Sequence, residues 1–148
     1  MADNTKRWCV LIPCSSTETW AVPQNCLAEI VTLQADTQQP PQQVQWRERT
    51  VPVLDLGNGD GSLWQQPRRE TGLVAIFLGL KGEGCEDWGV AVRGERLVVA
   101  GLSPETVEDV PGRALEHATA AFMFNGVLCQ VPDLDAFQKK IAASQMAA

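Results

Sequence analysis

Short apolar runs alternate with glycine, proline and polar turns along most of this chain, and that pattern is typical of a mainly β protein. The runs have the length of strands and are rich in Val, Ile, Leu and Trp. We expect strands at Trp8–Ile12, Thr19–Val22, Leu27–Leu33, Thr50–Leu56, Gly72–Leu80, Trp88–Val92 and Leu97–Val99. The run Gly72–Leu80 is apolar almost throughout, which predicts a strand buried on both faces.

The turns between these runs carry their own signals. Asn125-Gly126 predicts a two-residue hairpin turn within Phe122–Val131, and the glycine-rich stretch Gly57–Gly61 predicts the turn that ends the strand before it. Pro52 predicts an edge or bulged strand, because proline cannot donate to a ladder. Residues 34–45 include six glutamines and Pro40-Pro41, and we expect a loop that cannot organise itself there.

Two segments carry helix signals. Ser103 in an N-cap position, followed by Pro104, predicts a short helix over Thr106–Val110 that Pro111-Gly112 closes. Asp133–Ala142 has apolar residues at helical spacing and predicts an amphipathic C-terminal helix.

Charge narrows the class of protein. Twelve Lys and Arg oppose eighteen Asp and Glu in 148 residues, a net charge of −6, which disfavours binding to nucleic acid or to an anionic membrane surface. No apolar run has the length of a membrane span, so we expect no direct membrane insertion. Pro13 ends the first apolar run too early for a signal peptide, and we expect a cytoplasmic protein.

The sequence offers little catalytic or metal-binding chemistry. The cysteines are odd in number and lack a Cys-x-x-Cys pair, so we interpret them as reduced, buried thiols: Cys9, Cys14, Cys26, Cys85 and Cys129. We expect no metal and no cofactor. The single histidine, His117, is interpreted as a surface residue, and a Cys–His catalytic pair that uses it is kept as an alternative.

Two segments then carry a family resemblance. Trp46–Leu56 resembles the core motif of the CheW-like chemosensory adaptor family, hydrophobic-Arg-Gly-x-hydrophobic-hydrophobic-Pro-hydrophobic-hydrophobic-Asp-Leu, with Arg47, Pro52 and Asp55 in register. Trp20–Ile30 is similar to the family's aromatic-Ala/Gly-hydrophobic-Pro segment and the Val-x-Glu-Ile/Val stretch after it. Weaker matches at Trp88–Val92, Ser103-Pro104-Glu105 and Asp133-Leu134-Asp135 extend the resemblance over nearly the whole chain.

The resemblance implies a fold and a function. The fold is two five-stranded SH3-like β-barrels with a short C-terminal helix, and residues 1–148 form a single CheW-like domain of two β subdomains. The function is that of a non-catalytic adaptor between the cytoplasmic tips of methyl-accepting chemoreceptors and the regulatory domain of a CheA-type histidine kinase, in the cytoplasm at membrane receptor arrays. The alternatives are a small-molecule-binding β-barrel protein and a cysteine-dependent enzyme.

Four residues are implied as partner-binding by their place in the matched motifs: Leu27, Glu29, Arg47 and Asp55. Each also has a plainer interpretation. Leu27 fits a core position, Asp55 fits a cap for the glycine turn, and Arg47 fits a solvated surface. Glu29 lies on an otherwise apolar strand face, where a carboxylate needs a partner or an exposed rim.

The chain departs from the family pattern at several positions. Glu48 replaces a Gly, Gly57 replaces an Arg, Arg93 replaces an Asp, and Gln130 and Pro132 interrupt the last apolar strand. These departures fit an adaptor of an accessory pathway that controls pili or surface behaviour better than one of an ordinary flagellar array.

Overall fold

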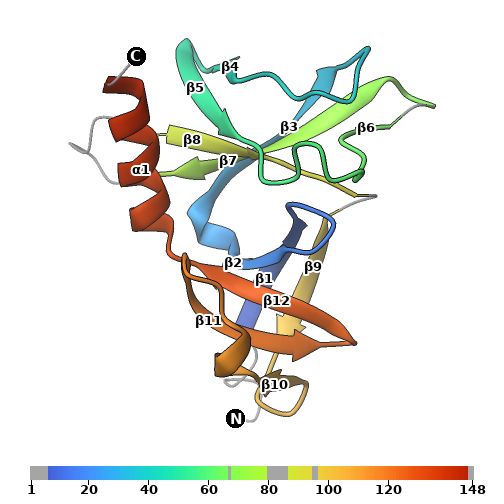
Figure 1. Cartoon of the computed structure of the whole chain (residues 1–148), viewed down its shortest axis with the longest axis vertical. Coiled ribbons are helices and arrows are strands. Elements are labelled where there is room, and N and C mark those ends of the chain that lie inside the picture. Colours follow the sequence, from blue (N-terminus) through green and yellow to red (C-terminus); the bar gives the residue numbers. More distant parts are fainter. Residues whose placement is uncertain (1–6, 67, 80–86, 95–96, 147–148) are drawn as a thin grey trace.

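A computed structural model describes residues 7–66, 68–79, 87–94 and 97–146, and it confirms the mainly β class (Figure 1). The strands are β1 (Arg7–Pro13), β2 (Thr19–Pro23), β3 (Leu27–Gln34), β4 (Gln43–Trp46), β5 (Arg49–Leu54), β6 (Gln65–Gln66), β7 (Thr71–Leu78), β8 (Asp87–Ala91), β9 (Val98–Leu102), β10 (Val107–Asp109), β11 (Ala118–Phe124) and β12 (Val127–Pro132). The helices are the 3-10 turns η2 (Gln24–Cys26) and η3 (Pro111–Arg113) and the α-helix α1 (Leu134–Met146).

These strands form two curled six-stranded sheets. The first, here called sheet 1, has the order β10-β11-β12-β2-β1-β9 and so combines both ends of the chain. Sheet 2 has the order β3-β7-β8-β5-β4, with the two-residue β6 paired to β7, and comes from the middle of the chain. Figure 1 shows sheet 2 above sheet 1 with α1 alongside. The strand beyond five in each sheet is a short one, β10 or β6.

Three apolar clusters fill this arrangement. The central core lies between the sheets and takes side chains from β1, β2, β7, β8 and α1, among them Trp20, Phe77, Trp88 and Phe137. The Trp88 ring stacks on Phe77 at 4.7 Å between centroids, and the Trp20 ring meets Phe137 at 5.0 Å. Separate clusters fill sheet 2, around Trp46 and Trp64, and sheet 1, around Leu11 and Phe122. We call these the sheet 2 core and the sheet 1 core.

Strand β7 connects two of these cores, as its nearly continuous apolar run predicts. Val74 and Ile76 are buried in the sheet 2 core, whereas Ala75 and Phe77 are buried in the central core. Successive strand residues point to opposite faces, so a strand covered on both sides needs apolar residues at both parities.

The hairpin and the C-terminal helix are confirmed. Asn125 and Gly126 have φ angles of 50° and 79° between β11 and β12, as a two-residue hairpin turn requires. Helix α1 begins after Asp133, whose Oδ1 accepts from Ala136 N at 3.1 Å as an N-cap. Among the described residues, no helix has the length and apolar character needed to cross a membrane.

The predicted helix over Thr106–Val110 is wrong. Thr106 N donates to Ser103 O at 3.0 Å in a tight turn, and the chain then enters β10, where Val107 pairs with Phe124 of β11. A five-residue helix gains few internal hydrogen bonds, whereas the edge of β11 offers partners for extended backbone and a core for Val107.

The predictions for Pro52 and for the loop at 34–45 also need correction. β5 is not an edge strand, because β4 flanks it on one side and β8 on the other; the pairing with β8 involves only Val53 and Leu54, which follow Pro52. The loop is shorter than predicted, since β4 begins at Gln43. We call residues 35–42 the Gln/Pro loop.

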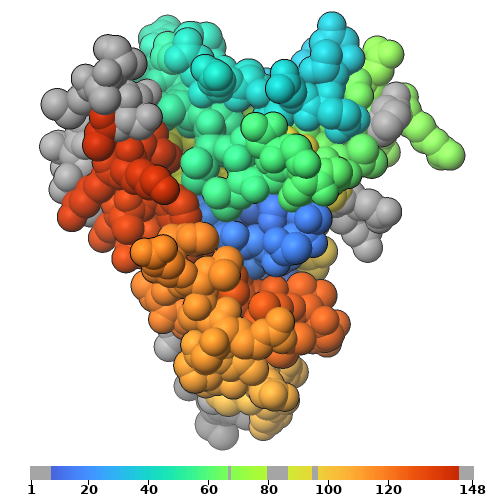
Figure 2. Space-filling model, viewed as in Figure 1, coloured from blue at the N-terminus to red at the C-terminus, as the bar shows by residue number. Residues whose placement is uncertain are grey.

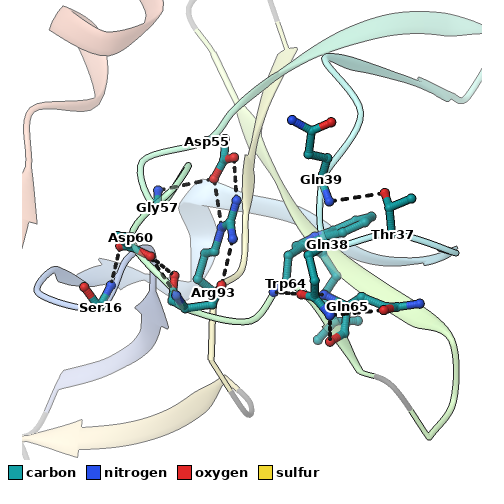
Figure 3. Close-up of polar contacts among 12 residues, drawn as sticks. Ser16, Thr37, Gln38, Gln39, Asp55, Gly57, Asp60, Trp64, Gln65 and Arg93 are labelled. Carbon is teal, nitrogen blue, oxygen red and sulfur yellow. Dashed lines mark hydrogen bonds and ion pairs between the residues drawn. The ribbon is translucent and has the colours of Figure 1, made fainter.

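The side chains of Gln38 and Gln65 hold the Gln/Pro loop, and Gln65 Nε2 donates to Ala35 O at 2.6 Å. Gln38 Oε1 accepts from Trp64 N at 2.9 Å and Gln65 N at 3.0 Å, while Gln38 Nε2 donates to Gln65 O at 3.1 Å (Figure 3). The loop therefore holds its place through polar contacts, which an argument from apolar burial alone does not anticipate.

Candidate partner-binding site

The hairpin between β4 and β5 presents Arg47 and Glu48 at its tip. Trp46 pairs with Arg49, so Arg47-Glu48 is a two-residue turn, and the φ angles of the two residues are 48° and 63°. This left-handed region favours glycine, and other residues adopt it at a cost. Glu48 stands at the position where the family motif has Gly. The turn is thus a strained element that holds two charged side chains outward.

Glu29 of β3 and Arg47 meet at this hairpin. Arg47 Nη2 lies 3.7 Å from Glu29 Oε1, and the same oxygen accepts from Trp46 Nε1 at 3.0 Å. The Arg47 guanidinium also lies 4.5 Å from the centre of the Trp46 ring. The side chains of Arg47 and Glu29 are 67% and 47% exposed, whereas Trp46 is buried in the sheet 2 core. We call Glu29, Trp46 and Arg47 the Glu29–Arg47 cluster.

This cluster also connects the two ends of sheet 2. β3 and β4 are the two ends of the sheet in strand order, yet the Trp46–Glu29 hydrogen bond joins them. The hydrogen bond explains why a carboxylate is accepted on an otherwise apolar face of β3, because its half-exposed oxygen receives an indole N–H.

Leu27 does not join this cluster. The register of β3 against β7 shifts between Leu27 and Glu29, so Leu27 packs on the central core while Val31 and Leu33 pack on the sheet 2 core. A strand with strict alternation would place Leu27 on the same face as Glu29, Val31 and Leu33, but Leu27 lies on the opposite face. An irregularity of one residue moves the residues before it to the other face.

Asp55 pairs with a buried arginine. Asp55 Oδ2 lies 2.7 Å from Arg93 Nη2 and Asp55 Oδ1 lies 3.0 Å from Arg93 Nε, a bidentate contact, while Arg93 Nη1 donates to Ser62 O at 2.8 Å. Gly57 N donates to Asp55 Oδ1 at 3.2 Å, so Asp55 also caps the glycine turn as expected (Figure 3). The Arg93 side chain is 4% exposed. Arg93, one of the departures from the family pattern, is thus the counter-ion of a motif residue.

The glycine turn is also tied to the other sheet. Asp60 accepts from Ser16 N, in the turn after β1, at 2.8 Å, and from Ser62 N at 2.8 Å and Ser62 Oγ (Figure 3). The donation from Ser16, then those from Ser62, hold the pKa of Asp60 below its usual range. The turn that follows the best-matched strand is therefore held from both sheets.

Two depressions lie outside the Glu29–Arg47 cluster. A polar cleft of about 470 Å³ separates the Gln/Pro loop from the glycine turn, which lie together on the face in Figure 2. An apolar groove of about 320 Å³ lies beside Cys9, Val107 and Phe122. The titratable groups that line them are Asp55 in the cleft and Cys9 and Asp109 in the groove. Among the described residues, no three potential metal ligands gather.

The histidine and the buried cysteines make structural contacts. His117 Nε2 lies 2.8 Å from Glu18 Oε2 and the ring packs on Phe137, so His117 is half-buried and paired, which corrects the surface interpretation. Burial raises the pKa of the Cys14 thiol well above its usual value and that of Cys129 to about 11. Such thiols stay protonated and are poor nucleophiles. Cys85 lies outside the described residues.

The contacts give the four implied residues different positions: Glu29 and Arg47 meet at the surface, Leu27 lies against the central core, and Asp55 binds Arg93. Sequence reasoning missed Arg93, because an arginine in a strand-end position is normally solvated and its partner lies 38 residues away.

Two half-barrels with separate cores, joined by a central core and a C-terminal helix, define the class of this protein as a paired SH3-like β fold. The scaffolding protein CheW from Thermoanaerobacter tengcongensis is similar to it: the match covers 88% of this chain and 90% of that chain, with a TM-score of 0.60 and 14% sequence identity. The chain therefore has a CheW-like fold. No family model matches the sequence, and no curated protein matches it.

Proposed function

We propose that this chain is a non-catalytic adaptor of a chemosensory pathway, which couples chemoreceptors to a CheA-type histidine kinase in the cytoplasm. The observation that carries the proposal is the Glu29–Arg47 cluster on a CheW-like fold. The glutamate and the arginine of the two matched motifs, 18 residues apart in sequence, form an exposed pair. The similar structure is that of a scaffolding protein.

The cluster has the chemistry of a contact surface. Arg47 makes one contact of 3.7 Å to Glu29, so most of its donors are available to a carboxylate of a partner. An exposed ion pair contributes about 0–1 kcal/mol, so exchanging Glu29 for a partner's carboxylate costs little. The Trp46 ring beneath the guanidinium limits the positions that Arg47 adopts, and preorganisation of this kind favours binding.

Leu27 and Asp55 support the proposal in another way. Leu27 packs on the central core, and Asp55 fixes the strand end and glycine turn that follow the hairpin. We propose that these two residues act by holding the hairpin and β3 in place. We further propose that residues 1–148 act as one domain, because the central core takes side chains from both sheets and α1.

The test is a binding measurement with two purified partners, the regulatory domain of a CheA-type kinase and the cytoplasmic tip of a chemoreceptor from the same organism. We expect Arg47→Ala to lower affinity for at least one of them by about tenfold or more, as loss of a central charge-assisted contact does. Its melting temperature should match the wild type, because an exposed substitution changes stability by about 0.5 kcal/mol or less.

Arg113→Ala is the matched control. Arg113 is an exposed arginine in η3, between β10 and β11 of sheet 1, and lies outside the Glu29–Arg47 cluster. It should bind both partners normally. Normal binding by Arg47→Ala would contradict the site, and failure of the wild-type chain to bind either partner would contradict the function. We also propose that the pathway is an accessory one that controls pili or surface behaviour. To test this, the affinities for a kinase and a receptor tip from a flagellar pathway are compared with those for the same two partners from a pilus-controlling pathway.

A further inference from the structure

The tip of the β4–β5 hairpin extends beyond the backbone ladder that joins the hairpin to sheet 2. β4 pairs with β5 as far as Trp46 opposite Arg49, the last pair before the turn, whereas the register of β5 with β8 contains two pairs, at Val53 and Leu54. The turn lies near the upper end of the molecule in Figure 1. A two-stranded hairpin by itself is marginally stable in water, so the tip needs other contacts to keep its orientation.

Two side-chain contacts hold this tip, one at each residue that flanks the turn. Trp46, before the turn, donates to Glu29 of β3. Arg49, after the turn, places its Nη1 2.6 Å from Oδ2 of Asp87, the first residue of β8. β3 and β8 are the two neighbours of β7 in the sheet order, so the contacts attach the hairpin to both sides of the same strand.

The burial of Asp87 determines how it can act. Its side chain is 8% exposed, whereas that of Arg49 is 60% exposed. A carboxylate with so little exposed surface does not itself reach a partner. Its attraction to a guanidinium is weakened less by water and salt than that of an exposed pair, and charge-assisted hydrogen bonds are the strong ones. Asp87 therefore acts from beneath the hairpin, through Arg49.

We propose that Asp87 is a positioning residue of the partner-binding site, which fixes through Arg49 the direction in which the turn presents Arg47. Its effect on binding rests on the proposed function, whereas its effect on the turn does not. Arg47 and Glu48 have φ angles of 48° and 63°, a costly backbone conformation that persists where the surroundings hold it. A turn that is already ordered binds without the entropy cost of ordering it.

The first test uses the full chain without a partner. Asp87→Ala removes the carboxylate, and ¹⁵N relaxation measures the order parameters of the Arg47 and Glu48 amides. We expect them to fall from the rigid value of about 0.85 towards the flexible range below about 0.6. Arg49→Ala breaks the same contact from its exposed side and should give the same fall, including where Asp87→Ala does not fold. Wild-type order parameters in a folded variant of this pair overturn the proposal.

The second test measures binding in a double-variant cycle with the kinase regulatory domain and the receptor tip. Asp87→Ala should lower affinity by about threefold to tenfold for the partner that Arg47→Ala weakens, because the competent orientation of the turn becomes a fraction of the population. In a chain that already carries Arg47→Ala, the same change should alter affinity by less than about twofold, since no guanidinium is left to position. Equal losses in both chains would overturn the proposal, because Asp87 would then act independently of Arg47.

Glu18→Ala is the matched control. Glu18 is also a carboxylate with little exposure, 11%, and is paired with a more exposed partner, His117, but it lies in the turn before β2 of sheet 1. Its loss should leave the order parameters of the β4–β5 turn and the binding of both partners unchanged. Failure of the wild-type chain to bind either partner contradicts the proposed function, and the order parameters still test Asp87. Normal binding by Asp87→Ala beside weakened binding by Arg47→Ala contradicts the positioning role alone.

Discussion

Two ion pairs in this protein consist of the same kinds of group but differ in burial. Arg93 and Asp55 form a bidentate pair with the arginine 4% exposed, whereas Arg47 and Glu29 form a single contact at the surface. Burial makes the loss of one partner expensive, because the remaining charge stays unpaired away from water. We therefore assign stability to the first pair and recognition to the second.

Asp55→Asn should destabilise the fold strongly. The change leaves the Arg93 guanidinium with a neutral partner, and breaking a buried pair costs about 3–5 kcal/mol. Urea unfolding followed by tryptophan fluorescence measures the loss. Glu29→Gln, at the exposed pair, should change the free energy of unfolding by about 1 kcal/mol or less.

A double variant separates charge burial from packing in this pair. Asp55→Leu with Arg93→Met replaces both charges by apolar groups and should be more stable than either single variant. A double variant as unstable as the sum of the two singles would show that the pair contributes through shape rather than charge.

The buried thiols give a second prediction. Burial raises the pKa of Cys14 and Cys129. In the folded chain both thiols therefore stay protonated at pH values where exposed thiols are ionised. The unfolded thiols lose protons from about pH 9, the folded Cys129 only near about pH 11, so the free energy of unfolding should fall as the pH rises through this window.

Alkylation at pH 8, mapped by peptide mass spectrometry, measures the reactivity. The peptides of Cys14 and Cys129 should react slowly in buffer and rapidly in denaturant. Cys26, which is half-buried, serves as the internal comparison. Rapid modification of Cys14 in the folded protein would contradict its buried position.

At the scale of elements, two hairpins use the same turn with different residues. Asn125-Gly126 is the preferred pair for a turn with positive φ at both positions, whereas Arg47-Glu48 adopts the same geometry without glycine. The strained backbone at Glu48 lies at the charged tip of the β4–β5 hairpin. Residues with strained backbone angles are concentrated at functional sites in proteins.

Glu48→Gly should stabilise the protein by about 0.5–1 kcal/mol, because it removes a left-handed penalty of about 1–2 kcal/mol and adds the smaller entropy cost of glycine. Differential scanning calorimetry would show a rise of a few degrees in melting temperature. Gly126→Ala tests the reverse: its added methyl meets nothing within 4 Å, so only the backbone changes, and we expect a loss of similar size. A lower melting temperature for Glu48→Gly would contradict the strain.

An element could be predicted when the signals that determine it lie within its own stretch of sequence. The apolar runs, the Asn125-Gly126 turn and the spacing in α1 are local signals, and the strands, hairpin and helix follow them. The helix signals at Ser103 and Pro104 are also local, but the edge of β11, reached through Phe124, captures the segment as a strand. The irregularity in β3 depends on its pairing with β7, which no pattern within β3 reveals.

The candidate site divides in the same way. Glu29 and Arg47 could each be selected from a motif, but their contact depends on the curl of sheet 2, which brings its two end strands together. Arg93 could not be selected, because nothing near it in sequence shows that Asp55 neutralises it. Contacts between strands that are distant in sequence are what the sequence pattern leaves open.

At the scale of the whole molecule, the order of strands has a consequence for synthesis on the ribosome. Sheet 2 uses the continuous stretch from Leu27 to Ala91, so its strands can pair as soon as that stretch leaves the exit tunnel. β1 and β2 emerge earlier, but their partners are β9 and β12, and a two-stranded hairpin alone is marginally stable. β1 and β2 thus wait for partners while sheet 2 folds, and β12 enters beside β2 only after the strands of sheet 2 and β9 to β11 have been made.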